Sequence, residues 1–133
     1  MKSGASRDSS NEPGEVYTGN VLPLLHEIKH ALQRWLETHE PAMIDVRSLP
    51  MGPGEEDALI DLLGEGEVRA RLSALGRSDI YETRYPGVWL VTHYNDNEEI
   101  MSRFIEVIDV PSILKSQADD VRDGLNRLAA HIG

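Results

Sequence analysis

The residues best suited to chemistry lie in "LLHEIKHAL", residues 24–32, which contains the pattern H-E-x-x-H. In zinc metalloproteases, two histidines one helical turn apart hold the metal, and the glutamate between them acts as a general base. His26, Glu27 and His30 stand in these places. The pattern raises the alternatives of a zinc hydrolase and of a metal-binding protein, against that of an ordinary surface helix.

The spacing of the neighbouring apolar residues favours the surface helix. These residues follow helical periodicity over 20–38, and they are Val21, Leu24, Leu25, Ile28, Leu32, Trp35 and Leu36. At about 100° per residue, His26 and His30 lie roughly opposite this stripe. The longer metalloprotease pattern also needs a glycine and a third histidine where the chain has Gln33 and Leu36. We therefore expect no catalytic residue and no cofactor, and only weak Ni²⁺ or Zn²⁺ binding by the two histidines.

A second group of candidate residues lies in "RYPGVWLVTH", residues 84–93. Arginine, tyrosine and tryptophan are the side chains most enriched at binding hot spots, and aromatic residues make up only 5% of this chain. Arg84, Tyr85, Trp89 and His93 are therefore the candidate partner-binding residues. Trp89 is also suited to anchor the core, and that interpretation is favoured for it.

Composition excludes several classes of function. The chain has 133 residues with 23 acidic and 13 basic side chains, a formal net charge of −10, which repels phosphate backbones and anionic lipid. We expect no nucleic-acid binding, and no membrane insertion because no apolar run approaches about 18–20 residues. The absence of cysteine excludes disulfides and thiolate metal sites and fits a cytoplasmic location.

The periodicity predicts one α+β domain at residues 20–133, after a flexible tail at 1–19 that is too polar to bury surface. The order is α-β-α-β-β-β-β-α-α, which we expect to form two layers, with helices packed on a largely antiparallel sheet. The expected elements are helix 20–38, strand 42–47, helix 55–63, strands 67–73, 79–85, 88–94 and 100–108, and helices 111–115 and 118–131.

Three local features refine this prediction. Asn20 is a suitable N-cap for the first helix. Pro86 and Gly87 either turn a hairpin or mark a bulge in one long strand. The last helix has an apolar stripe typical of a helix that packs on a core, formed by Val121, Leu125, Leu128 and Ile132.

An ordered series of motifs carries a resemblance to a known family. The motifs are "IDVRSLPMGPGEEDAL", "LLGEGEV", "ETRYPGVWLVTH" and "FIEVIDVPSIL", followed by "QADDVRDGLNRL" in the last helix. From about residue 22 to residue 130, the chain resembles the C-terminal conserved region of hydrogenase expression/formation proteins of the HupH/HyaF type. The H-E-x-x-H histidines are not a signature of this family.

The resemblance implies an accessory, assembly or chaperone-like role in the maturation of nickel–iron uptake hydrogenases. The family has no established catalytic residues, so the resemblance implies a protein that is not an enzyme. Its expected partner is a hydrogenase subunit or another hydrogenase maturation protein. A chain without cysteine cannot carry metal through sulfur, so we expect it to act by binding a polypeptide.

Overall fold

The computed structural model describes residues 19–73 and 76–133. Its elements follow the expected order, with the short penultimate helix present as a 3-10 turn. They are α2 (Val21–Thr38), β1 (Ala42–Asp45), η1 (Val46–Ser48), α3 (Glu55–Leu63), β2 (Arg69–Ser73), β3 (Arg77–Glu82), β4 (Val88–Tyr94), β5 (Ile100–Val107), η2 (Ser112–Leu114) and α4 (Ala118–Ile132). The expected flexible tail lies outside the described residues, apart from Gly19. The helices that the structure describes include none long and apolar enough to cross a bilayer.

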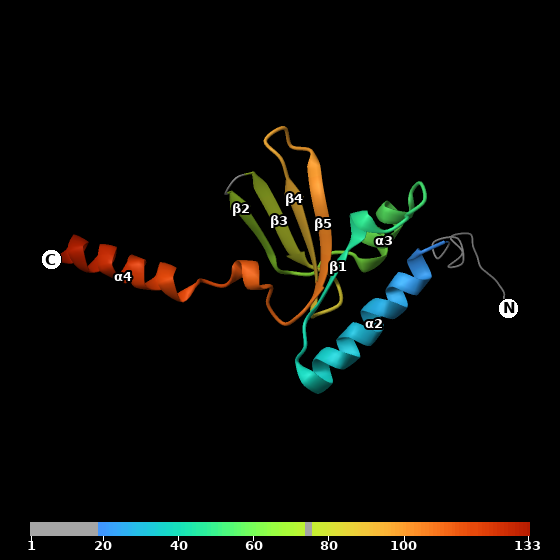
Figure 1. The fold of residues 1–133 in the computed structure, drawn as a ribbon, viewed down its shortest axis with the longest axis horizontal. Coiled ribbons are helices and arrows are strands. Elements are labelled where there is room, and N and C mark those ends of the chain that lie inside the picture. Colours follow the sequence, from blue (N-terminus) through green and yellow to red (C-terminus); the bar gives the residue numbers. More distant parts are fainter. Residues whose placement is uncertain (1–18, 74–75) are drawn as a thin grey trace.

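The five strands form one antiparallel sheet in the order β1-β5-β4-β3-β2 (Figure 1). The strands β3 and β4 pair directly, from Ser78 opposite His93 to Glu82 opposite Trp89. Pro86 and Gly87 therefore lie in the turn of a hairpin, which decides between the two alternatives that the sequence left open. The expected antiparallel α+β architecture is confirmed.

The helices α2 and α3 cover one face of the sheet (Figure 1). This face holds the larger core cluster, which includes Leu24 and Ile28 of α2, Leu59 of α3, and Leu90 and Ile105 of the central strands. Burial of these aliphatic side chains is the main force that docks the two helices.

A partly buried ion pair connects α3 to the sheet on the same face. Arg103 of β5 lies 2.7 Å from the carboxylate of Glu56 in α3, and its Nε donates to the hydroxyl of Thr92 at 3.1 Å. The Arg103 side chain is only 13% exposed, so its charge depends on these two partners. The start of α3 is therefore held against the centre of the sheet.

The second face of the sheet is covered by chain without a long helix. Ile80, Trp89 and Val91 are buried there, beneath Ile108 and Leu114 among others. The indole Nε1 of Trp89 donates to the carbonyl of Ile108 at 3.0 Å. Residues 108–114, which we call the strap, thus replace a second layer of helices on this face.

The last helix departs from the expectation that the helices pack on the sheet. Within the described residues, α4 has no buried residue, and Figure 1 shows it projecting away from the sheet and from α2. The physical reason is that both faces are already covered, one by α2 and α3 and the other by the strap. The apolar stripe of α4 is left exposed.

The start of α2 also differs from the expectation. Asn20 makes no side-chain cap, and its amide instead donates to the carbonyl of Pro50 at 2.5 Å. The carboxylate of Glu55 accepts from the backbone N–H of Asn20 at 3.2 Å and of Gly52 at 2.6 Å. These contacts connect the beginnings of α2 and α3. Local sequence patterns do not predict them, because Asn20 and its partners are far apart in the sequence.

Candidate functional site

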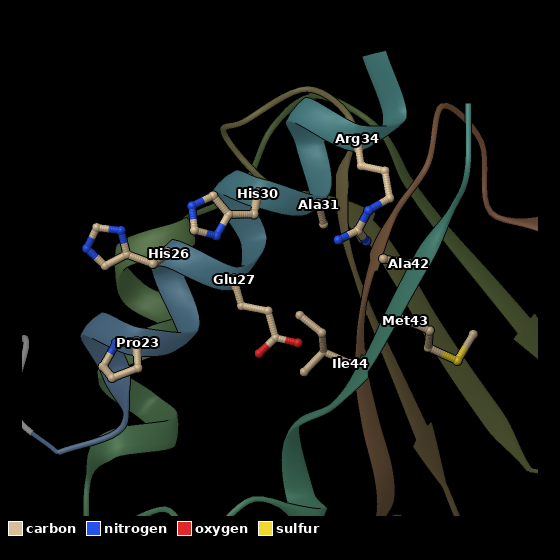
Figure 2. Close-up of a pocket in the computed structure, with 9 residues that line it drawn as sticks. All are labelled: Pro23, His26, Glu27, His30, Ala31, Arg34, Ala42, Met43 and Ile44. Atoms are coloured by element: carbon tan, nitrogen blue, oxygen red, sulfur yellow. The ribbon is translucent and has the colours of Figure 1, made fainter. Parts of the chain in front are cut away.

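The histidines of the H-E-x-x-H pattern lie on the exposed face of α2, as their helical angle indicated. Both are exposed, and their ring centroids are 6.4 Å apart. Figure 2 shows Glu27 pointing toward β1, away from both imidazole rings. The glutamate is therefore not oriented toward an ion that the two histidines would share.

The metal-binding hypothesis has two candidate ligands and, within the described part of the chain, no third. Among residues 19–73 and 76–133, no group of three or more His, Cys, Asp or Glu side chains is placed to hold a metal ion. A catalytic zinc site needs three protein ligands and an open fourth position. Weak binding of Ni²⁺ or Zn²⁺ by His26 and His30 stays a prediction.

A cavity with a mixed polar and apolar lining lies between α2 and the edge strand β1. Its volume is about 470 Å³, and its lining includes His26, Glu27, His30 and Arg34 from α2 and Met43 from β1. Figure 2 shows Glu27 and Arg34 directed toward β1. This cavity combines one carboxylate and one guanidinium with exposed strand edge, and it contains no arrangement of a nucleophile with a base.

The four candidate partner-binding residues of "RYPGVWLVTH" do not form one site. Arg84 and Tyr85 are exposed in the β3–β4 hairpin, Tyr85 by 49%. Trp89 is 4% exposed and lies in the core cluster under the strap, which confirms the core interpretation of this residue. His93 is half-buried, and the hairpin therefore offers two of the four residues to a partner.

The ring of His93 is held by its neighbours on the sheet. Its Nδ1 lies 2.7 Å from the Ser78 hydroxyl on β3, and its ring meets that of Phe104 edge-on, with centroids 6.0 Å apart. A cross-strand hydrogen bond and an aromatic contact account for both sides of this histidine. The His93 side chain therefore makes its contacts within the sheet.

Tyr85 belongs to an apolar depression that the sequence motifs did not indicate. A cavity of about 250 Å³ lies between α2 and the hairpin, with a lining that includes Leu25, Leu32 and Tyr85. A second cavity of about 500 Å³ adjoins it at Leu32, and its lining includes Trp35 and Leu36 of α2 and Pro86 of the hairpin. We call these two cavities together the α2–hairpin groove.

The signal for this groove is present in the first helix. Its apolar stripe is wider than the buried part, which comprises Val21, Leu24, Ile28 and Ala31. Leu25, Leu32 and Leu36 lie at one edge of the stripe, and Leu36 remains 72% exposed. An apolar arc that exceeds what the core requires indicates a surface open to another molecule.

The wall of the groove formed by the hairpin is rigid. The Thr83 hydroxyl, on a side chain only 2% exposed, donates to the Val88 carbonyl at 2.9 Å and accepts from the Tyr85 N–H at 3.2 Å. The Gly87 N–H donates to the Glu82 carboxylate at 3.1 Å. The Arg84 N–H donates to the Leu63 carbonyl at 2.9 Å, so the hairpin is fastened to α3 as well.

Gly87 lets the hairpin approach α2 closely. Its φ is +91°, and a Cβ at this position would lie 3.4 Å from the Leu32 side chain. Only glycine adopts this backbone conformation without strain. The position and shape of the groove thus depend on the Pro86–Gly87 turn.

Comparison with known proteins places the chain in a family. Residues 18–133 match the family described as "HupH hydrogenase expression protein, C-terminal conserved region". The chain is 30% identical over 126 residues to hydrogenase expression/formation protein HupH of Rhizobium leguminosarum bv. viciae, covering 95% of this chain and 45% of that protein. It is 29% identical over 119 residues to hydrogenase expression/formation protein HoxQ of Azotobacter vinelandii, covering 86% and 42%.

A solved structure shows the same fold. The hydrogenase expression protein HupH from Thiobacillus denitrificans superposes with a TM-score of 0.83 at 41% sequence identity, over 86% of this chain and 96% of that one. The chain spans less than half the length of the two curated relatives. By the match to residues 18–133, this chain belongs to the HupH hydrogenase expression protein family, through its C-terminal conserved region.

Proposed function

We propose that this chain is an accessory protein in the maturation of nickel–iron uptake hydrogenase. In this proposal it acts in the cytoplasm, by binding a hydrogenase subunit or another hydrogenase maturation protein, and it is not an enzyme. Membership of the family supports an accessory role in hydrogenase expression or formation. The two relatives are more than twice as long as this chain. We therefore also propose that this chain is active without the additional segment that the relatives have.

The α2–hairpin groove is the observation that carries the binding mechanism. It presents aliphatic and aromatic side chains on a rigid frame, with Leu36 and Tyr85 standing out from it. Interfaces that bind folding clients or subunits use such apolar and aromatic centres within a polar rim. Lys29, Glu82 and Asp109 supply that rim here.

A binding experiment with matched variants tests this proposal. The variants Leu36→Asp and Tyr85→Asp place a charge in the groove and are expected to weaken capture of hydrogenase subunits or maturation proteins by at least about tenfold, the effect of one lost hot spot. Capture is measured by pull-down from a hydrogenase-expressing strain, with the captured proteins identified by mass spectrometry.

Met101→Asp is the matched control. Met101 is 63% exposed, similar to Leu36, and it lies on β5 outside the lining of the groove. This variant is expected to capture the same proteins as the wild type. Equal loss in all three variants, or normal hydrogenase activity in a strain that lacks the gene, would contradict the proposal.

A further inference from the structure

The helix α4 exposes a continuous apolar stripe. Val121 is 57% exposed, Leu125 63%, Leu128 59% and Ile132 76%. The helix projects away from the rest of the protein (Figure 1), and none of its residues is buried within the part of the chain that the structure describes. With this stripe exposed, the 15-residue helix α4 lacks the tertiary packing that normally stabilises a helix of this length.

The spacing of the stripe is that of a coiled-coil seam. Ala118 precedes the four exposed residues, and the five positions are separated alternately by three and four residues. A helix that packs on a broad core has a wider apolar face, whereas a seam confined to two of seven positions favours a single partner helix. The pattern therefore specifies another helix as the object that covers α4.

A glycine beside the seam supports close approach of that helix. Gly124 lies in the middle of α4, where it costs about 1 kcal/mol relative to alanine. A Cβ at this position would meet no atom within 4 Å, so nothing in the described chain explains the glycine. Ala129 lies on the other flank of the seam. Because Gly124 has no side chain and Ala129 only a methyl group, another helix can lie close to the backbone of α4 on either side of the seam.

The charges of α4 make it complementary to a copy of itself in the antiparallel orientation. Its first half carries Asp119, Asp120 and Asp123 against one arginine, and its second half carries Arg127 and His131 with no acidic residue. Antiparallel pairing places the acidic half of each helix beside the basic half of the other, and parallel pairing places like halves together. The four exposed apolar positions are also symmetric about a point between Asn126 and Arg127, so one register serves both copies.

We propose that two copies of this chain pair through α4 in an antiparallel, two-fold symmetric arrangement. Leu125 of one copy packs against Leu128 of the other, and Val121 packs against Ile132. The lining of the α2–hairpin groove contains no residue of α4, so the pairing leaves the groove open on each copy. The proposal concerns assembly and stands apart from the role in hydrogenase maturation.

The mass of the full chain in solution tests the pairing. Sedimentation equilibrium of the wild type is expected to give twice the 14.8 kDa of the chain. The double variant Leu125→Asp, Leu128→Asp is expected to give the monomer mass, because it buries charge in the seam. Ala130→Asp, on the opposite side of α4, is the matched control and is expected to remain dimeric.

A second variant separates loss of the interface from loss of the helix. Leu125→Ala with Leu128→Ala keeps a high helix propensity and is also expected to be monomeric, with far-UV circular dichroism showing that the chain is folded. A wild type that is monomeric at its highest soluble concentration overturns the proposal. So does a dimer that persists in both double variants.

The absence of native cysteine allows a clean test of orientation. A mixture of Val121→Cys chains and Ile132→Cys chains is expected to form mixed disulfides under mild oxidation. Val121→Cys chains alone are expected not to cross-link, because about 16 Å of helix rise separates the two introduced thiols in the antiparallel pair. Efficient cross-linking of Val121→Cys chains to one another would show a parallel pair and overturn the arrangement.

Discussion

At the scale of single residues, the two aromatic side chains of "RYPGVW" differ in burial. Trp89 is buried against Val91 and Ile80 and fills the space under the strap. Tyr85 is half exposed at the rim of the α2–hairpin groove. Their separation by four residues across a tight turn places one in the core and the other at the rim of the α2–hairpin groove.

This difference predicts opposite effects of two alanine substitutions. Trp89→Ala is expected to lower the free energy of unfolding by about 3–5 kcal/mol, through lost burial and the cavity left behind. Tyr85→Ala is expected to change it by less than about 1 kcal/mol while weakening partner capture. Urea unfolding followed by circular dichroism measures both. A Trp89→Ala variant as stable as the wild type would contradict the placement of this side chain.

Another residue with a definite electrostatic signature is Glu106, half-buried on β5 opposite Trp89. Burial raises the pKa of its carboxyl, and the charge of His93 opposes this shift only in part. The unfolded chain, with an ordinary pKa, ionises Glu106 more readily than the folded chain does. The free energy of unfolding therefore falls as the pH rises from the ordinary carboxyl pKa through the raised one.

Glu106→Gln removes this cost of ionisation. The variant is expected to be more stable than the wild type at neutral pH, and the advantage is expected to disappear below the ordinary pKa of a glutamate, where Glu106 is protonated in both states. Urea unfolding at a series of pH values measures the difference. A stability gain that is constant over the whole pH range would indicate a cause other than this carboxyl.

At the scale of elements, the β3–β4 hairpin connects the candidate site to the core. The Thr83 side chain is 2% exposed and satisfies the Val88 carbonyl and the Tyr85 N–H within the turn. The same turn is fastened to α3 through the N–H of Arg84. The orientation of Tyr85 and Pro86 toward α2 thus depends on a hydroxyl that is buried within the turn.

Thr83→Val tests this dependence. The substitution keeps the shape of the side chain and removes the hydroxyl, so the Tyr85 N–H loses its acceptor, while the Val88 carbonyl keeps the backbone N–H of Thr83. We expect a loss of about 1–3 kcal/mol in the free energy of unfolding together with weaker partner capture. Thr38→Val, at an exposed threonine near the end of α2, is the control and is expected to leave capture unchanged. Full capture by a destabilised Thr83→Val protein would show that the groove does not need this turn.

At the scale of the whole molecule, the protein divides into a body with two covered sheet faces and a helix that lies outside it (Figure 1). The larger cluster under α2 and α3 and the smaller one under the strap share the central strand β4. The body contains all the buried apolar residues of the described chain. Its stability therefore does not depend on contacts from α4.

Removal of residues 118–133 tests this division. The shortened chain is expected to unfold with nearly the same thermal midpoint as the full chain, because α4 contributes no buried residue to the described structure. Differential scanning calorimetry measures the midpoint, and pull-down from the hydrogenase-expressing strain measures retention of the groove. A midpoint lowered by many degrees, at a concentration where the full chain is monomeric, would show that α4 packs on the body in solution.

The elements themselves follow from local patterns in the sequence. The nine-residue helix α3 begins and ends where its acidic first turn and Gly64 predict. The alternation of apolar residues identifies β2, and the continuous apolar run 88–91 identifies β4. Family membership was also readable from the sequence, because the motif series runs through the strands and turns that define the fold. The exposed positions of His26 and His30 follow from the 100° rotation of each helical residue.

Tertiary structure alone decided which apolar surface is covered. Both α2 and α4 carry an apolar stripe in the sequence, yet the stripe of α2 is mostly docked on the sheet and that of α4 is exposed. A sheet has only two faces, and the number of segments that compete to cover them depends on the whole chain. A local sequence pattern therefore does not show which stripe will be covered. For the same reason, the groove between α2 and the hairpin joins Leu36 to Pro86, two residues that only the packing of the chain brings together.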